Sequence, residues 1–121
     1  MIQGLRSAIY PAKDLAAAKA WYGAVLGVEP YFDQPFYVGY TVGGFELGLV
    51  PDGTPGSHGV QAYWGVPDAE AELKRLVELG ARVFEEVRDV GGGIKVASVE
   101  DPFGNTFSIV ENPHFDAASV R

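Results

Sequence analysis

The chain has 121 residues, 47% of them hydrophobic, and a formal net charge of -7. This length suits one compact domain with its own core and leaves no room for a second domain of full size. Its 9 Lys and Arg side chains are scattered among 16 Asp and Glu. The resulting field repels polyphosphate, so we do not expect nucleic acid as a partner.

Cysteine is absent from the sequence, which excludes thiolate chemistry, cysteine-bound metals and disulfide bonds. No apolar run approaches the roughly 18 residues that a membrane span needs. The first residues also lack the basic and then apolar pattern of an export signal. We therefore expect a cytoplasmic protein with no membrane partner.

The first half of the chain predicts a strand, a helix and three further strands. Residues 5–10 alternate in polarity, and Pro11 ends this strand because proline cannot donate to a ladder. Apolar residues then recur at three- and four-residue steps between Asp14 and Gly27, which predicts a helix with Asp14 near its N-terminus and Gly27 just after its end. The predicted strands that follow are residues 30–32, 37–42 and 45–50, the last two joined by a Gly43-Gly44 turn.

The second half repeats this order after a connection, residues 53–59, that is rich in glycine and proline. A strand ends at Pro67, and a helix runs between Asp68 and Gly80. Its predicted apolar face is Leu73, Leu76, Val77 and Leu79. The remaining predicted strands are residues 82–87, 94–99 and 106–110, with Gly91, Gly92 and Gly93 in a hairpin turn.

Corresponding landmarks of the two halves lie 53 to 56 residues apart, as Gly27 and Gly80 or Pro11 and Pro67 show. A repeat that occurs only twice indicates a duplicated module rather than a solenoid, which needs about three copies. Each module reads βαβββ, so the predicted class is α+β. We expect one domain with modules at residues 1–52 and 60–112 and a tail at 113–121.

Two segments, DLAAAKAWYGAVLG and VEDPFGNTFSIVE, resemble the vicinal oxygen chelate superfamily. That superfamily includes glyoxalase I, extradiol dioxygenases, fosfomycin resistance proteins and bleomycin-binding proteins. The resemblance spans residues 4–112 and implies two βαβββ modules that curl into a half-open barrel around a central cleft, often in a homodimer. Because the superfamily contains isomerases, oxygenases, transferases and pure binders, the resemblance alone does not identify the function.

Metal-using members hold their ion with one side chain from the first strand and one from the last strand of each module. The matching positions here are Ser7, Gly48, Gln61 and Ser108. A divalent ion in a partly buried cleft needs anionic or imidazole ligands, and this set supplies neither. We therefore expect no metal and no cofactor. Glu46 faces the same side as Gly48, but one carboxylate would not complete a metal site.

Without an ion, the same positions would line a cleft for a small molecule, unless their side chains merely close the core. Strand alternation places one set of residues on that lining: Ser7, Ile9, Glu46, Gly48, Gln61, Tyr63 and Ser108. The strand at 37–42 adds either Tyr37, Gly39 and Thr41 or Val38, Tyr40 and Val42. We expect packing roles beneath the helices for Leu47, Leu49, Trp64, Phe107, Ile109, Trp21 and Tyr22.

The remaining chemically active side chains predict no further site. His58 and His114 lack a second ligand at metal-binding spacing, so we expect both to be exposed. Glu111 lies three residues from Ser108 and should project from the opposite face as a solvated strand end. No catalytic triad can be assembled, because neither histidine lies on a predicted element.

Three functions remain open at this point. The leading hypothesis is a metal-free protein that binds a small organic molecule in the cleft between the modules, as the bleomycin-binding members do. The alternative is an enzyme of the glyoxalase type, either a metal-dependent lyase or dioxygenase using Gln61 and Glu46, or a metal-free isomerase. In the isomerase, Glu46 would be the general base, because an apolar cleft raises the pKa of a carboxylate. The third is an interaction module whose sheet edges pair between chains.

Overall fold

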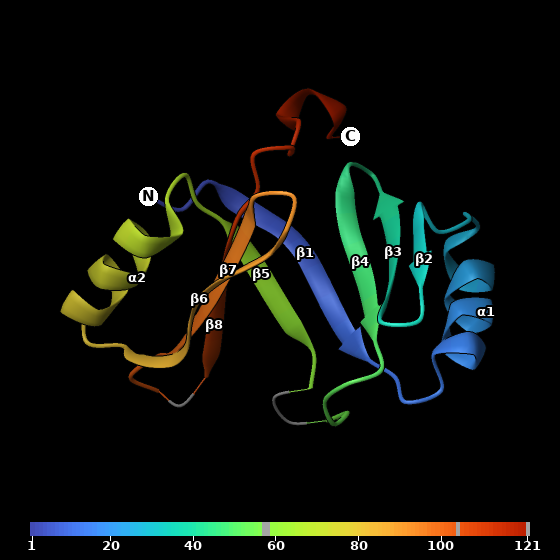
Figure 1. The fold of residues 1–121 in the computed structure, drawn as a ribbon, viewed down its shortest axis with the longest axis horizontal. Helices are drawn as coiled ribbons and strands as arrows, with labels where there is room; N and C mark the ends of the chain where they lie inside the picture. The colour runs from blue at the N-terminus through green and yellow to red at the C-terminus, as the bar shows by residue number, and fades with distance from the viewer. Residues whose placement is uncertain (57–58, 104, 121) are drawn as a thin grey trace. The chain divides into compact units, whose positions relative to one another are not determined.

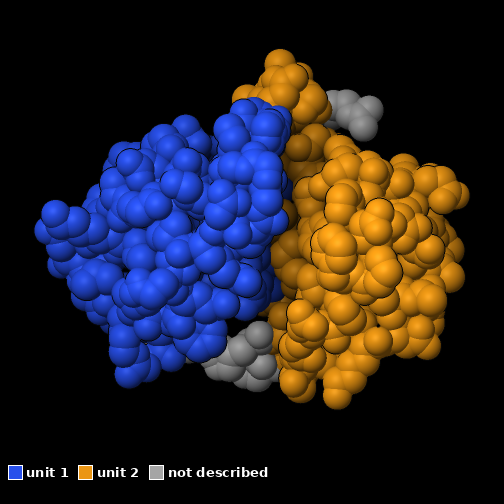
Figure 2. Space-filling view, in the orientation of Figure 1, with its two compact units in different colours: residues 1–6, 61–115 blue, residues 7–60, 116–121 orange. Residues whose placement is uncertain are grey.

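The computed structural model describes residues 1–56, 59–103 and 105–120. The chain forms two compact units, one of residues 1–6 with 61–115 and one of residues 7–60 with 116–121 (Figure 2). The units thus differ from the predicted modules at both ends of the chain, because the first six residues group with the second half and the last six with the first.

The first βαβββ module contains five elements and is joined by a short 3-10 helix from the tail (Figure 1). The five elements are β1 (Gly4–Pro11), α1 (Leu15–Leu26), β2 (Phe32–Gln34), β3 (Tyr37–Val42) and β4 (Phe45–Val50), and the 3-10 helix is η1 (Ala117–Ser119). The strands lie in the order β2-β3-β4-β1, and only the β4-β1 pair is parallel. The predicted strand at 30–32 lies two residues later, because Pro35 takes a turn position and Gln34 pairs with Tyr37.

The second module repeats this arrangement and confirms the α+β class with two tandem βαβββ units. Its elements are β5 (Gln61–Gly65), α2 (Ala69–Glu78), β6 (Arg82–Gly91), β7 (Ile94–Glu100) and β8 (Thr106–Glu111). The strand order is β5-β8-β7-β6, with β5 and β8 parallel. Strand β6 runs past the predicted residue 87 up to the glycine turn, and its register shifts three times against β7.

Both helices begin and end where their capping residues predict. The Asp14 carboxylate accepts a hydrogen bond from the Ala17 backbone N–H at 3.0 Å, and Gly27 takes a left-handed φ of 71°. The Asp68 carboxylate accepts from Ala71 N–H at 3.1 Å. Each such cap contributes on the order of 1 kcal/mol to helix stability. Neither helix in the described part of the chain is long and apolar enough to cross a membrane.

Each helix covers one face of its own module's strands (Figure 1). In the first module, α1 packs over the fully buried Val38, Tyr40 and Leu49. In the second, α2 packs over Ala97, Val99 and Ile109. The predicted packing roles are confirmed for five residues that belong to these clusters: Leu47, Leu49, Phe107, Ile109 and Tyr22. The Trp64 ring stacks on the Phe107 ring, with the ring centroids 6.0 Å apart.

Three residues expected in the core are exposed instead. Trp21 is 61% exposed, because successive helical residues point about 100° apart and Tyr22 occupies the core side. Val77 is 43% and Leu79 65% exposed. The buried side of α2 is set by Ala69, Glu72 and Leu73, and Val77 and Leu79 lie off that stripe.

Two glycines of the first module predict opposite effects of an added methyl group. A Cβ at Gly23, inside α1, would have no atom outside its own stretch of helix backbone nearer than 3.8 Å, so Gly23→Ala should raise the free energy of unfolding by about 0.5–1 kcal/mol. Gly44 has φ of +91°, and its Cβ would lie 2.6 Å from the Val120 backbone. Gly44→Ala should therefore lower stability by more than about 1 kcal/mol. Urea unfolding of both variants tests this, and equal shifts would contradict it.

A buried carboxylate holds the start of α2 to the start of the chain. Glu72 is only 3% exposed, accepts from Arg75 Nη2 at 2.6 Å and lies 3.1 Å from the Met1 amino group. The hydrogen bond from Arg75 is the largest cause that lowers the pKa of Glu72, and the Met1 amino group adds to it, while burial opposes both. The carboxylate is therefore ionised in the folded protein.

Replacing this carboxylate should weaken the fold in a pH-dependent way. The pKa of Glu72 is lower in the folded protein than its ordinary value. Glu72 therefore stabilises the fold at any pH above that ordinary pKa, and this stabilisation disappears as the pH falls through the folded pKa. Glu72→Gln should cost about 1–3 kcal/mol at neutral pH, and this difference should shrink in acid. Glu78→Gln, on the exposed side of the same helix, is the control. A constant difference from neutral to acidic pH would contradict the assignment.

Candidate functional site

The register of the first module places four of the predicted site residues on one face. Ser7 pairs with Glu46, and Ile9 pairs with Gly48, across β1 and β4. Directly paired residues project to the same side of a sheet. We call this side, which carries Ser7, Ile9, Glu46 and Gly48, the Glu46 face.

The same register decides the question left open for the strand at 37–42. Thr41 pairs with Glu46, and Gly39 pairs with Gly48. Tyr37, Gly39 and Thr41 therefore belong to the Glu46 face, whereas Val38 and Tyr40 lie in the core under α1. Helix α1 packs on the opposite side of these strands and does not cover the Glu46 face.

Two phenols engage the carboxylate at the centre of this face. The Tyr31 hydroxyl donates to Glu46 Oε1 at 2.6 Å, and the Tyr37 hydroxyl donates to Glu46 Oε2. Partial burial, and then the hydrogen bond to Glu46, raise the pKa of Tyr31 well above its ordinary value. Tyr31 is therefore a protonated donor at neutral pH. The sequence left Tyr37 as one of two alternatives for the lining and gave no sign of Tyr31.

Two glycines make room for these rings. A Cβ at Gly48 would overlap the Tyr37 hydroxyl and lie 2.7 Å from Ile9 Cδ1. A Cβ at Gly39 would lie 2.9 Å from a Tyr31 ring atom and 3.0 Å from a Tyr37 ring atom. Because Gly39 and Gly48 are paired, they form a flat strip across β3 and β4, and the tyrosine rings lie over it.

The second module carries a neutral polar strip at the equivalent place. Tyr63 pairs with Ser108 across β5 and β8, and its hydroxyl donates to Gln61 Oε1 at 2.9 Å. The buried hydroxyls of Ser108 and Ser98 share a hydrogen bond of 2.8 Å, and Ser98 also donates to Glu85 at 3.4 Å. Burial, and then the charge of Glu85, raise the pKa of Tyr63. The structure thus brings Gln61, Tyr63 and Ser108 together and adds Ser98.

A cation borders this strip. A Cβ at Gly65 would lie 2.5 Å from Arg6 Nε, and Arg6 Cζ lies 3.8 Å from the centre of the Phe115 ring. Burial lowers the pKa of Arg6. Because Gly65 has no side chain, the Arg6 guanidinium group can lie against β5.

Residues 7–110 match the glyoxalase-like domain family. The chain belongs to that family. This glyoxalase-like chain is also 33% identical, over an alignment of 110 residues that covers 80% of the chain, to an anthracycline biosynthesis protein, DnrV, from Streptomyces peucetius. The match spans 37% of the length of that relative. The resemblance to the vicinal oxygen chelate superfamily is thereby confirmed.

Solved structures support the same fold for the glyoxalase-like chain. A Streptomyces coelicolor methylmalonyl-CoA epimerase variant in complex with 2-nitronate-propionyl-CoA has a TM-score of 0.73 at 17% identity, covering 97% of this chain and 99% of that one. A glyoxalase/bleomycin resistance protein/dioxygenase superfamily member from Vibrio splendidus has a TM-score of 0.69 at 24% identity, covering 88% and 97%. At these identities the similarity shows the fold alone, because the chemistry of a site depends on its side chains.

The four positions where metal-using relatives carry ligands do not fit a divalent ion in this glyoxalase-like chain. At Gly48 the Tyr37 hydroxyl fills the space of a side chain, and it bonds to Glu46. Gln61 accepts from Tyr63, and the Ser108 hydroxyl is bonded to Ser98. Ser7 would remain with a single neutral hydroxyl, a weak ligand for such an ion.

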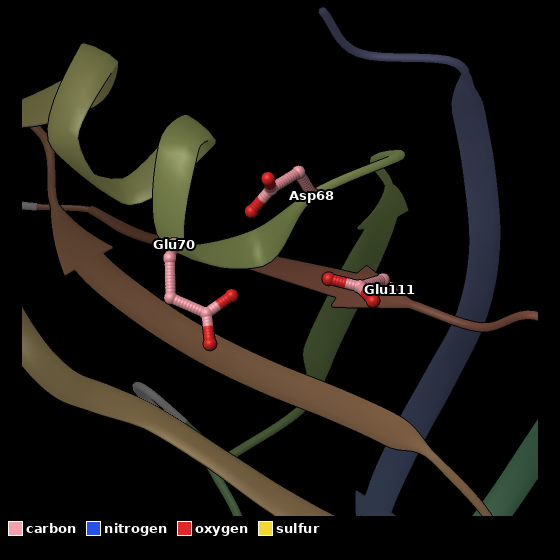
Figure 3. A group of neighbouring side chains, drawn as sticks. All are labelled: Asp68, Glu70 and Glu111. Atoms are coloured by element: carbon pink, nitrogen blue, oxygen red, sulfur yellow. The ribbon is translucent and has the colours of Figure 1, made fainter.

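A group of three carboxylates lies elsewhere, at the N-terminus of α2. Oxygens of Asp68, Glu70 and Glu111 lie within 4.8 Å of one another (Figure 3). Each already has a partner in the protein: Asp68 caps the helix, Glu111 accepts from Ala69 N–H at 2.8 Å, and Glu70 pairs with Lys95 at 3.3 Å. Their arrangement is that of a capped helix start.

Glu111 and His114 both have partners in the structure. Glu111 is half-buried and bonded to the helix, so its prediction as a solvated strand end was wrong. Sequence parity could not reveal this contact, because it joins β8 to a helix 42 residues away. His114 is exposed as expected, with Nε2 2.7 Å from the Gly92 carbonyl oxygen, whereas His58 lies outside the described residues.

A hollow of about 460 Å³ lies beside α1, away from the Glu46 face. Its walls include Gly23, Gly27, Pro30 and an ion pair between Lys19 and Asp33 of 2.9 Å. Lys19 and Asp33 are thus paired with each other within the protein.

Removing the charge of Glu46 should change the ionisation of Tyr31. Because the carboxylate accepts from the Tyr31 hydroxyl, Glu46→Gln should lower the pKa of that tyrosine toward its ordinary value. An ultraviolet titration of tyrosinate measures the change, with Asp52→Asn as the control. Superimposable titrations of Glu46→Gln and the wild type would contradict the hydrogen bonds described for this face.

Proposed function

We propose that this glyoxalase-like chain binds a small organic molecule on the Glu46 face, through hydrogen bonds and packing rather than through a metal ion. The supporting observation is the filled position at Gly48, where the Tyr37 hydroxyl replaces a ligand side chain and bonds to Glu46. Polar groups that converge on an otherwise apolar surface are typical of small-molecule sites.

The polar centre is organised before any ligand arrives. Tyr31 and Tyr37 hold both oxygens of Glu46, and each carboxylate oxygen still has a lone pair for a further donor. A ligand hydroxyl or amine could therefore bond to Glu46 without displacing a phenol. Such preorganisation lowers the entropy cost of binding.

Relatives of the chain support a small-molecule ligand. The methylmalonyl-CoA epimerase structures, which share the fold, hold CoA esters. DnrV is named for anthracycline biosynthesis, and both names refer to small organic molecules. We extend to this chain only the class of ligand, and Ser7, Ile9 and Gly48 are proposed to line the site beside Glu46. Gln61, Tyr63 and Ser108 are proposed as ligand-binding residues of the second module.

An enzyme that uses Glu46 as general base is the second candidate. A carboxylate on an open sheet face is a suitable base, but both oxygens already accept hydrogen bonds from phenols. Proton removal from a bound molecule would require one of these donors to turn away or to relay the proton. The geometry therefore favours binding over turnover. The homodimer and the cytoplasmic location stay predictions.

A ligand screen by thermal unfolding tests the proposal. A binder at 100 times its Kd should stabilise the wild-type protein by about 2.7 kcal/mol. Glu46→Gln and Tyr37→Phe should lose most of that gain, whereas Asp52→Asn should keep it. A metal chelator should leave the stabilisation by the ligand unchanged, and Mg²⁺, Mn²⁺, Ni²⁺ or Zn²⁺ should not raise the Tm of the protein. A stoichiometric transition metal in the natively purified protein would overturn the metal-free proposal.

A further inference from the structure

Four aromatic residues cluster at the β2 end of the first module. Phe32 lies 6.4 Å from Tyr31, 5.9 Å from Phe36 and 6.0 Å from Tyr37, measured between ring centroids. Tyr31 is 58%, Phe32 38% and Phe36 65% exposed. We call this cluster, Tyr31, Phe32, Phe36 and Tyr37, the aromatic edge.

The core of the module does not explain the aromatic edge. Its fully buried residues pack under α1 on the other face, whereas Phe32 pairs with Gly39 and so projects to the Glu46 face. Phe36 occupies the turn between β2 and β3, a place where Gly, Asn or Asp is usual. Exposed rings here cost solvation free energy and suggest a binding role.

The aromatic edge continues directly into the polar centre. Tyr31 belongs to both, since its ring lies near Phe32 and its hydroxyl donates to Glu46. The Tyr31 and Tyr37 rings lie over the strip of Gly39 and Gly48, where neither glycine has a side chain of its own. A flat molecule could therefore contact the rings and reach the carboxylate together, whereas a bulky saturated one would contact them less completely.

The local charge disfavours anionic ligands. Residues 7–60 contain five carboxylates but only two lysines and no arginine. Of the lysines, Lys19 is paired with Asp33, and Lys13 lies in the connection before α1. No cation among the described residues of this range is therefore placed to receive a phosphate or sulfonate on the Glu46 face.

From these observations we infer that the ligand is a flat, uncharged aromatic molecule with a hydroxyl group. Its rings contact Phe32 and Phe36, and its hydroxyl donates to Glu46. The inference rests on the proposed function and narrows it to a ligand class. It also separates this chain from relatives that hold CoA esters, whose phosphates carry negative charge.

A set of matched probes tests the ligand class. We would titrate the full chain with 2-naphthol, 2-naphthalenesulfonate, which has the same rings and a charge, and trans-2-decalol, which has the hydroxyl and no aromatic ring. Calorimetry gives the affinity, and changes in the NMR chemical shifts of the Gly39 and Thr41 amides locate the bound probe. Binding of 2-naphthol should be saturable and at least about tenfold tighter than that of either comparator, because stacking and charge repulsion both favour it.

Leucine variants isolate the contribution of the rings. Phe32→Leu and Phe36→Leu keep apolar volume but remove the ring, and each should weaken 2-naphthol binding about threefold to tenfold. Phe103→Leu is the control, since Phe103 is 86% exposed in the turn before β8 and belongs to the second module. Circular dichroism checks that all three variants fold.

The outcomes separate this inference from the proposed function. Equal binding of trans-2-decalol, with no effect of Phe36→Leu but a loss in Glu46→Gln, would overturn the aromatic class and support binding at the Glu46 face. If none of the three probes binds, the aromatic ligand class is also overturned. The ligand screen by thermal unfolding would then test the proposed function by itself. Self-association that Phe36→Leu abolishes, without probe binding, would show that a second copy covers the aromatic edge.

Discussion

The chemistry of the first module depends on the missing side chain at Gly48. Because that position is empty, the Tyr37 hydroxyl lies across β4 and bonds to Glu46. Any larger residue would push the phenol away and leave the carboxylate with Tyr31 as its donor. A glycine in a strand weakens it by removing packing, and here it also makes room for a hydrogen-bonded group.

The two modules share a topology but differ in the polar groups they present. In the first, a carboxylate holds two phenols, whereas in the second a tyrosine, a glutamine and two serines form a neutral strip. The last-strand position is engaged within its own module in both cases, at Gly48 by a tyrosine and at Ser108 by Ser98. The duplication thus preserved the arrangement of strands while the donor groups diverged.

This divergence explains why the family relation and the function have to be argued separately. A TM-score of 0.73 at 17% identity means that the backbone course is shared while most side chains differ. The hydrophobic pattern that builds a βαβββ module tolerates many residues at each strand position. What a member binds depends on the few side chains that converge on one face, and we propose that here they centre on Glu46.

Local patterns were sufficient for much of the fold and for part of the site. The caps at Asp14 and Asp68 and the strands at 37–42 and 45–50 follow from residue chemistry and periodicity over a few residues. Alternation within one strand also placed Glu46 and Gly48 on one face, because side-chain direction has a period of two.

Only tertiary structure could decide the remainder, because it depends on which strands pair and in which register. The segment YVGYTV carries a tyrosine on either parity, so its pairing with β4 decides that Tyr37 faces Glu46 and Tyr40 enters the core. The contacts of Glu111 with α2 and of Tyr31 with Glu46 join residues far apart in the chain. No periodicity in the sequence encodes such contacts, since they form only when separate elements pack together.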